Sequence, residues 1–223
     1  MLNEPERMAW VEREIQNSAT HLKNHSVLDV GAGLSPFKPM LENYGFKYSS
    51  HDFNSYTPNR VESTGLQNSS WLYPKHDFNC DILEIASTKK FNLILCTEVF
   101  EHVPDPVAAF GKLVELCDVD GYIILTFPFI SLMHQAPYWF SSGLSPFWIK
   151  YWSEQYNLEI CKVEVSGDFV DLIIQELTRL VTSKFTIRGI SRVIKLIHFL
   201  RPCIPEQVLQ SGGFGTFAVL RKC

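Results

Sequence analysis

Short apolar runs alternate with helical patterns along the first half of the chain. Four of these runs are predicted strands, at 26–30, 47–52, 91–96 and 121–127. Between the last two, apolar residues recur at helical spacing from Pro104 to Cys117, which is long enough for a crossover between parallel strands. This alternation predicts an α/β fold.

The second half continues the pattern with longer helices. Its predicted elements are an aromatic helix at 141–156, a strand at 158–165, a helix at 167–181 and a final strand at 213–222. No Ser/Gly linker or internal repeat separates them from the first half, so these strands are expected to extend one sheet. The sequence predicts a single domain over 1–223.

Composition narrows the class of protein. The chain has 223 residues, of which 46% are hydrophobic, enough to bury one core. Twenty Lys and Arg against 24 Asp and Glu give a charge of -4, so we expect no double-stranded DNA partner. The six cysteines form no C-x-x-C pair, and residues 1–15 lack the apolar stretch of a secretory signal. These features predict reduced thiols and a cytoplasmic location.

A glycine turn follows the first predicted strand. Gly31 and Gly33 let the backbone turn sharply and approach a ligand at the carboxyl end of the strand. Asp52, nineteen residues beyond Gly33, ends the next strand, where an acid accepts both hydroxyls of an adenosine ribose. A structural turn without a ligand is the alternative interpretation.

The turn departs from the dinucleotide fingerprint, because Pro36 replaces the third glycine. Ser35 and Pro36 are instead predicted as the N-cap and first residue of a helix. This favours a nucleoside ligand over NAD. Asp81 is a candidate acceptor for an adenine amino group, with Asp77 as its competitor and a solvated loop acid as the alternative for either.

These residues carry a family resemblance. The sequence VLDVGAGLSPF, Asp52, Asp81, and FNLILCTEVFEHVPDP followed by the strand GYIILTFPF resemble the class I S-adenosylmethionine-dependent methyltransferases over about residues 26–165. The resemblance implies a Rossmann-like doubly wound sheet of seven strands, mostly parallel with the last strand antiparallel, and helices on both faces. It divides the chain into an N-terminal helix (1–25), a cofactor-binding core (26–165), a basic helical insertion or lid (166–212) and a final strand (213–221).

The resemblance also assigns the cofactor site. Asp29, Gly31 and Gly33 are expected to hold the methionine end of S-adenosylmethionine, and Asp52 its ribose. Asp81 with Ile82 is expected at the adenine, and Thr97 at the floor of the pocket. The expected reaction is O-methylation of a sugar, a glycolipid or another small hydroxylated acceptor.

A cluster of candidate ligands follows the strand at 91–96. Glu98, Glu101 and His102 are spaced so that one helical turn aims them the same way, and His134 follows the next strand. This set suits a divalent cation, Mg²⁺ or Mn²⁺, that binds a substrate hydroxyl. Without a metal, His134 or His102 is a candidate general base. The alternative interpretation is that these side chains only stabilise their loops.

Similar E-x-x-E-H patterns occur in metal-dependent members of the resembling family, including some quinone and RNA-end O-methyltransferases, which is the alternative function. A non-catalytic nucleoside-binding subunit is the alternative from another class. A dehydrogenase or epimerase is disfavoured by Pro36 and by the absence of a Y-x-x-x-K motif.

The segment 177–205 has basic residues and no Asp or Glu. Its basic residues are Arg179, Lys184, Arg188, Arg192, Lys195 and Arg201. Arg188, Arg192 and Lys195 share one helical face, which is typical of an interfacial or lid helix. The options for 179–201 are a solvated helix, contact with an anionic membrane, or a phosphorylated substrate.

Overall fold

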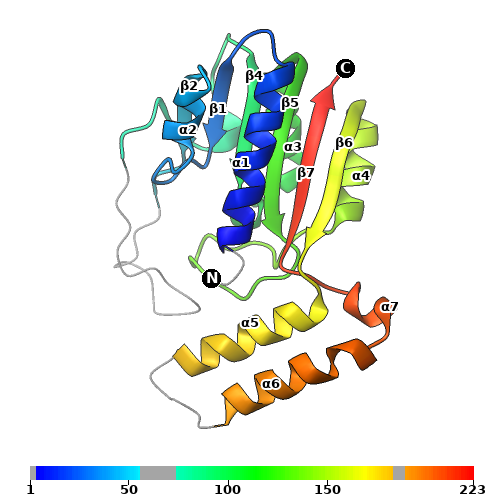
Figure 1. The fold of residues 1–223 in the computed structure, drawn as a ribbon. Coiled ribbons are helices and arrows are strands. Elements are labelled where there is room, and N and C mark those ends of the chain that lie inside the picture. Colours follow the sequence, from blue (N-terminus) through cyan, green and yellow to red (C-terminus); the bar gives the residue numbers. More distant parts are fainter. Residues whose placement is uncertain (1–3, 56–73, 183–188) are drawn as a thin grey trace.

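The computed structural model describes residues 4–55, 74–182 and 189–223. Its centre is one sheet in the order β3-β2-β1-β4-β5-β7-β6 (Figure 1). The strands are β1 (Ser26–Val30), β2 (Lys47–Asp52), β3 (Phe78–Asn79), β4 (Phe91–Thr97), β5 (Cys117–Pro128), β6 (Leu158–Ser166) and β7 (Gly215–Lys222). β7 runs antiparallel to both neighbours, and the remaining pairs are parallel. The predicted sheet of seven strands with an antiparallel last strand is confirmed.

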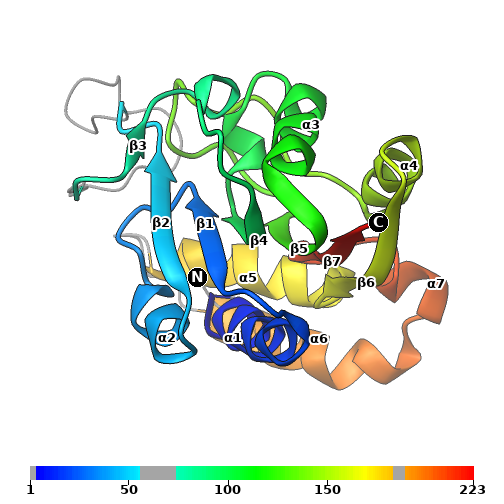
Figure 2. The same ribbon diagram turned by 90° about the horizontal axis from the view of Figure 1, so that it is seen from above.

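Helices cover both faces of the sheet, as Figure 2 shows. The helices are α1 (Glu4–His21), α2 (Lys38–Asn43), α3 (Pro106–Leu116), α4 (Pro146–Gln155), α5 (Phe169–Thr182), α6 (Ile190–Leu200) and α7 (Glu206–Leu209), with short 3-10 helices η2 (Ile82–Glu84), η3 (Phe100–His102) and η4 (Arg201–Cys203). α1 and α2 bury Trp10, Ile15 and Leu41 on one face. α3 and α4 bury Phe110 and Ile149 on the other. Two apolar cores therefore sandwich the sheet.

Local sequence explains where α3 and α4 begin. Asp105 accepts hydrogen bonds from the backbone N–H groups of Val107 and Ala108, and Ser145 accepts one from Trp148. In both helices a proline follows the cap, at the one position where its missing N–H costs nothing. Both ends are thus fixed by short-range hydrogen bonds.

The cap predicted at Ser35 and Pro36 is wrong. α2 begins at Lys38, and its N-cap is Phe37. Ser35 has a φ of 53° and donates its backbone N–H to the carbonyl of Ala32. Ser35 helps to close the glycine turn, so it cannot adopt the extended backbone of a capping residue.

The segment between β6 and β7 lies beyond the sheet. Pro128 pairs with Gly215, and Gly215 pairs with Ser166, so β5 and β6 both end at the carboxyl edge of the sheet. From there the chain forms α5, α6 and α7 before it returns as β7. Figure 1 shows α5 and α6 side by side beneath that edge, with α6 farther from the sheet. The predicted insertion therefore faces the side where ligands bind in such sheets.

All six cysteines are unpaired. Cys96 and Cys117 are buried, whereas Cys161, Cys203 and Cys223 are exposed. Among the described helices, none combines the length and the hydropathy needed to cross a membrane.

Candidate functional site

The predicted glycine turn lies at the carboxyl end of β1. Gly31 and Gly33 have φ values of +68° and +52°, a region that favours glycine. A Cβ atom added to Gly31 would overlap the side chain of Val99, which belongs to the segment after β4. The turn therefore needs glycine both for its conformation and for the close approach of this segment.

Asp52 joins the end of β2 to this turn. Its Oδ2 accepts the backbone N–H of Gly33 at 2.9 Å, and its Oδ1 accepts that of Asn54 at 2.9 Å. Each carboxylate oxygen has further acceptor capacity beyond one hydrogen bond. The carboxylate is thus oriented by the backbone and keeps acceptor capacity for a ligand.

Asp29 lies one residue from the end of β1 and is 2% exposed. The hydroxyl of Tyr48 donates to its Oδ2 at 2.7 Å. Burial, with a smaller contribution from the nearby Asp52 charge, raises the pKa of Asp29 to about 7. A cation placed beside Asp29 would therefore favour loss of its proton.

Asp81 and Asp77, the two candidates for the adenine end, have different environments. Asp77 accepts the backbone N–H of Ser50 at 2.9 Å, so it supports β2. Asp81 caps η2 by accepting the N–H of Leu83 at 2.9 Å, and Ile82 is buried beside it. Both carboxylates therefore accept a backbone hydrogen bond, and Asp81, with the buried Ile82 beside it, stays the adenine candidate.

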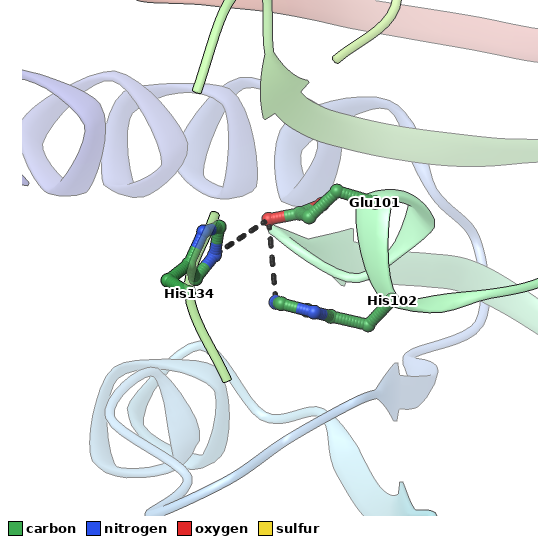
Figure 3. A group of neighbouring side chains, drawn as sticks. All are labelled: Glu101, His102 and His134. Carbon is green, nitrogen blue, oxygen red and sulfur yellow. Dashed lines mark ion pairs between the residues drawn. The ribbon is translucent and has the colours of Figure 1, made fainter. Parts of the chain in front are cut away.

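Three of the four predicted metal-site residues converge, as Figure 3 shows. Oε1 of Glu101 lies 3.6 Å from Nε2 of His102 and 3.9 Å from Nε2 of His134. One ligand atom from each of the three residues lies within 4.8 Å of the other two. Glu101 and His102 belong to η3 after β4, and His134 to the loop after β5.

Hydrogen bonds determine which nitrogen of each imidazole carries a hydrogen. Nδ1 of His102 contacts the carbonyl of Tyr138, and Nδ1 of His134 contacts that of Leu132 at 2.9 Å. A carbonyl only accepts, so each Nδ1 carries a proton, and in the neutral form of either ring the lone pair is on Nε2. Burial lowers the pKa of His102 to about 4, which keeps that ring neutral.

Glu101 is the buried member of this trio. Its side chain is 2% exposed, and its Oε2 has no hydrogen-bond partner among the described residues. Burial raises the pKa of this carboxyl well above its ordinary value. An unpaired buried carboxylate is costly, so the arrangement favours a bound proton or cation.

Glu98 does not join the trio. Its Oε2 pairs with Arg7 of α1 at 3.0 Å, and its Oε1 accepts the hydroxyl of Thr126 at 3.0 Å. The helical turn predicted to align Glu98 with Glu101 is wrong, because Glu98 has a φ of 54° and η3 begins only at Phe100. The structure thus separates Glu98 from the other three predicted ligands.

Two residues near the site gave no signal in the sequence. Arg7 of α1 pairs with Glu98 and so joins the N-terminal helix to the segment after β4. Phe53, next to Asp52, packs edge-on against Tyr138 with ring centroids 5.3 Å apart. Tyr138 in turn supports His102 through its carbonyl. Phe53 therefore links the Asp52 side of the site to the histidines.

Thr97 ends β4, in register with Thr126 of β5. The predicted site residues thus lie at the carboxyl ends of β1, β2 and β4 or in the segments that follow β1, β3, β4 and β5. They gather along one edge of the sheet, with carboxylates at one end and the trio at the other.

Comparison with known proteins assigns the family. A family model described as a methyltransferase domain matches residues 5–162, which contain the glycine turn, Asp52 and the trio. The chain belongs to this methyltransferase family. It is an enzyme of the class I S-adenosylmethionine-dependent type, and the resemblance seen in the sequence is confirmed. No curated protein matches the chain.

Solved methyltransferases share the fold. An S-adenosylmethionine-dependent methyltransferase from Archaeoglobus fulgidus is 17% identical with a TM-score of 0.55, over 99% of this chain and 98% of that one. The N-methyltransferase NodS from Bradyrhizobium japonicum WM9, in complex with S-adenosylhomocysteine, is 12% identical with a TM-score of 0.53, over 98% and 87%. The fold shared with these methyltransferases therefore extends over nearly the whole chain.

Proposed function

We propose that this methyltransferase methylates a hydroxyl oxygen of a sugar, a glycolipid or another small hydroxylated acceptor. The observation that carries the proposal is the pair of Nε2 lone pairs, from His102 and His134, directed at Glu101 beside the cofactor residues. A hydroxyl must lose its proton when it accepts a methyl group. A neutral imidazole in this place takes that proton.

The cofactor is S-adenosylmethionine, whose sulfonium supplies the methyl group and the leaving group. Asp52 accepts hydrogen bonds from the ribose hydroxyls, and Asp29 faces the methionine end across the turn formed by Gly31 and Gly33. Asp81 and Ile82 flank the adenine, and Thr97 forms the floor. These residues contribute chiefly by fixing the distance and angle between acceptor and methyl group.

A divalent cation is the second candidate for the trio. Two histidines and one carboxylate are a common ligand set that leaves open positions for a substrate oxygen. Both rings donate Nδ1–H to backbone carbonyls, which is the usual support for a metal-binding Nε2. Glu101, His102 and His134 would hold Mg²⁺ or Mn²⁺. This version favours the quinone or RNA-end type of O-methyltransferase.

Substitution of His134 tests both versions. We expect His134→Ala to lower turnover on hydroxylated acceptors by about 10²–10⁴-fold, the usual contribution of a general base. Affinity for S-adenosylhomocysteine should stay unchanged, because His134 lies on the acceptor side. His21→Ala, an exposed histidine of α1, is the matched control.

A chelator distinguishes a metal-free general base from a bound divalent cation. If turnover vanishes with a chelator and returns with Mg²⁺ or Mn²⁺, the trio holds a cation. Chelator-insensitive turnover with a defective His134→Ala leaves a plain general base. Unchanged turnover in His134→Ala would exclude both. S-adenosylhomocysteine binding with no methyl transfer to any hydroxylated acceptor would favour a nucleoside-binding subunit.

A further inference from the structure

Helix α6 presents an uncovered apolar face to solvent. Val193, Leu196, Phe199 and Leu200 are all exposed, and Phe199 is 77% exposed. α6 packs against α5, and its more buried side holds Ile190, Ile194 and Ile197. Figure 1 shows α5 between α6 and the sheet. These four side chains therefore do not pack against α5 or the sheet.

The charges around this face are of one sign. Arg192 and Lys195 are exposed on α6 and make no ion pair with any residue in the described part of the chain. The acids of the neighbouring helix are already matched: Asp171 binds Arg201, and Glu176 pairs with Arg179. The sequence from 177 to 205 contains no further Asp or Glu. The outer side of α6 is thus both apolar and basic.

We propose that α6 docks the enzyme on an anionic lipid bilayer. Leu196 and Phe199 would enter the acyl boundary, while Arg192 and Lys195 remain at the level of the lipid phosphates. An exposed apolar face bordered by basic residues is the pattern of helices that lie in a membrane interface. Four exposed apolar side chains lie within eight residues of α6, and a grouped apolar surface marks an interaction site, whereas a single exposed side chain does not.

The bilayer explains features that two other occupants leave unexplained. A soluble phosphorylated ligand would account for Arg192 and Lys195 but not for the apolar residues beside them. A second copy of the chain would cover the apolar residues but would bring two basic α6 helices together, which is unfavourable. The inference concerns α6 alone and does not depend on which acceptor is methylated.

Vesicle sedimentation with the full-length protein tests the proposal. We expect binding to vesicles of phosphatidylcholine with phosphatidylglycerol at low salt, and weak binding to phosphatidylcholine alone. High salt should release the protein, because it screens the basic residues. Phe199→Ser should lower the partition coefficient about tenfold through lost apolar burial. Arg192→Glu with Lys195→Glu should lower it at least as much.

Helix α4 supplies a matched control. Phe147 is 74% exposed and Lys150 lies near its ring, so Phe147→Ser with Lys150→Glu makes one Phe-to-Ser change and one charge reversal outside α6. This variant should bind vesicles like the unaltered protein. All substituted side chains are exposed, and circular dichroism checks that each variant is folded.

Three results would overturn the proposal. The first is no binding to anionic vesicles at low salt. The second is equal loss of binding in the α4 control and the α6 variants. The third is loss of a dimer in Phe199→Ser, measured by light scattering, with vesicle binding unchanged, which would assign the face to a second copy. If the first result is accompanied by inorganic phosphate binding that requires Arg192 and Lys195, these residues belong to a site for a soluble ligand.

Discussion

The Asp52 carboxylate closes the glycine turn, and we propose that it also binds the ribose of the cofactor. We expect Asp52→Ala to weaken S-adenosylhomocysteine binding by about 1.5–3 kcal/mol, the scale of hydrogen bonds to a charged group. Isothermal titration calorimetry measures the change. Unchanged affinity would place the nucleoside elsewhere in the protein.

Asp77→Ala is the control for this experiment. Asp77 also accepts a backbone hydrogen bond, from Ser50, but it supports β2 rather than the turn. Its loss should lower the free energy of unfolding by about 1–3 kcal/mol and leave the binding affinity nearly constant. If both variants lose affinity equally, the effect of Asp52→Ala is structural.

Burial of Asp29 makes stability depend on pH. Its pKa rises from 3.8 to about 7 in the folded protein, so the folded state binds this proton more tightly than the unfolded state does. The contribution is present below about pH 4 and is lost as pH rises to about 7, a change on the order of 4 kcal/mol. Asp29→Asn should remove this component. Urea unfolding at pH 5 and pH 8 measures the part of this change that falls above pH 5, about 3 kcal/mol. Equal pH dependence in both proteins would contradict the prediction.

At the scale of elements, one arginine joins the end of α6 to the start of α5. Arg201, just after α6, binds Asp171 through two nitrogens at 2.7 and 3.0 Å and also contacts Asp168. We expect Arg201→Met to release α6 and raise amide exchange in residues 190–200 about tenfold or more. Hydrogen exchange with mass spectrometry measures this, and α3 should exchange as before. Unchanged exchange in α6 would show that apolar contacts with α5 suffice.

Elements were predictable where their signals are local. β1 and β2 have the predicted bounds, because apolar runs and flanking turn residues define them. The start of α2 was missed, because Ser35 is needed by the turn and not by the helix. The alignment of Glu98 with Glu101 was missed for a related reason: a spacing of three residues predicts a shared face only if the helix is present.

The site was predictable only in part. Glu101, His102 and His134 follow adjacent parallel strands, so topology alone brings them to one edge. The ion pair between Arg7 and Glu98 joins segments far apart in sequence, and no periodicity encodes it. Of the basic residues singled out in the sequence, Lys184 and Arg188 lie outside the described residues.

At the scale of the whole molecule, the α5–α6 segment is attached at two neighbouring points. Ser166 and Gly215 are direct partners across β6 and β7. Replacing residues 167–214 with Asn-Gly should therefore join these strands by a two-residue hairpin. We expect the shortened protein to fold, bind S-adenosylhomocysteine and lose vesicle binding. Calorimetry and sedimentation measure these, and a protein without cooperative unfolding would show that the segment supports the sheet.

The place of β7 in the sheet has a consequence for folding during synthesis. β7 lies between β5 and β6, yet the ribosome makes residues 215–222 after both of them. Until then β5 and β6 have no shared partner, and the apolar edge of β5 is open to other chains. Closing the sheet needs contacts over a long sequence separation, which slows folding. The extent of aggregation in the cell should thus depend on how quickly these eight residues pair with β5 and β6.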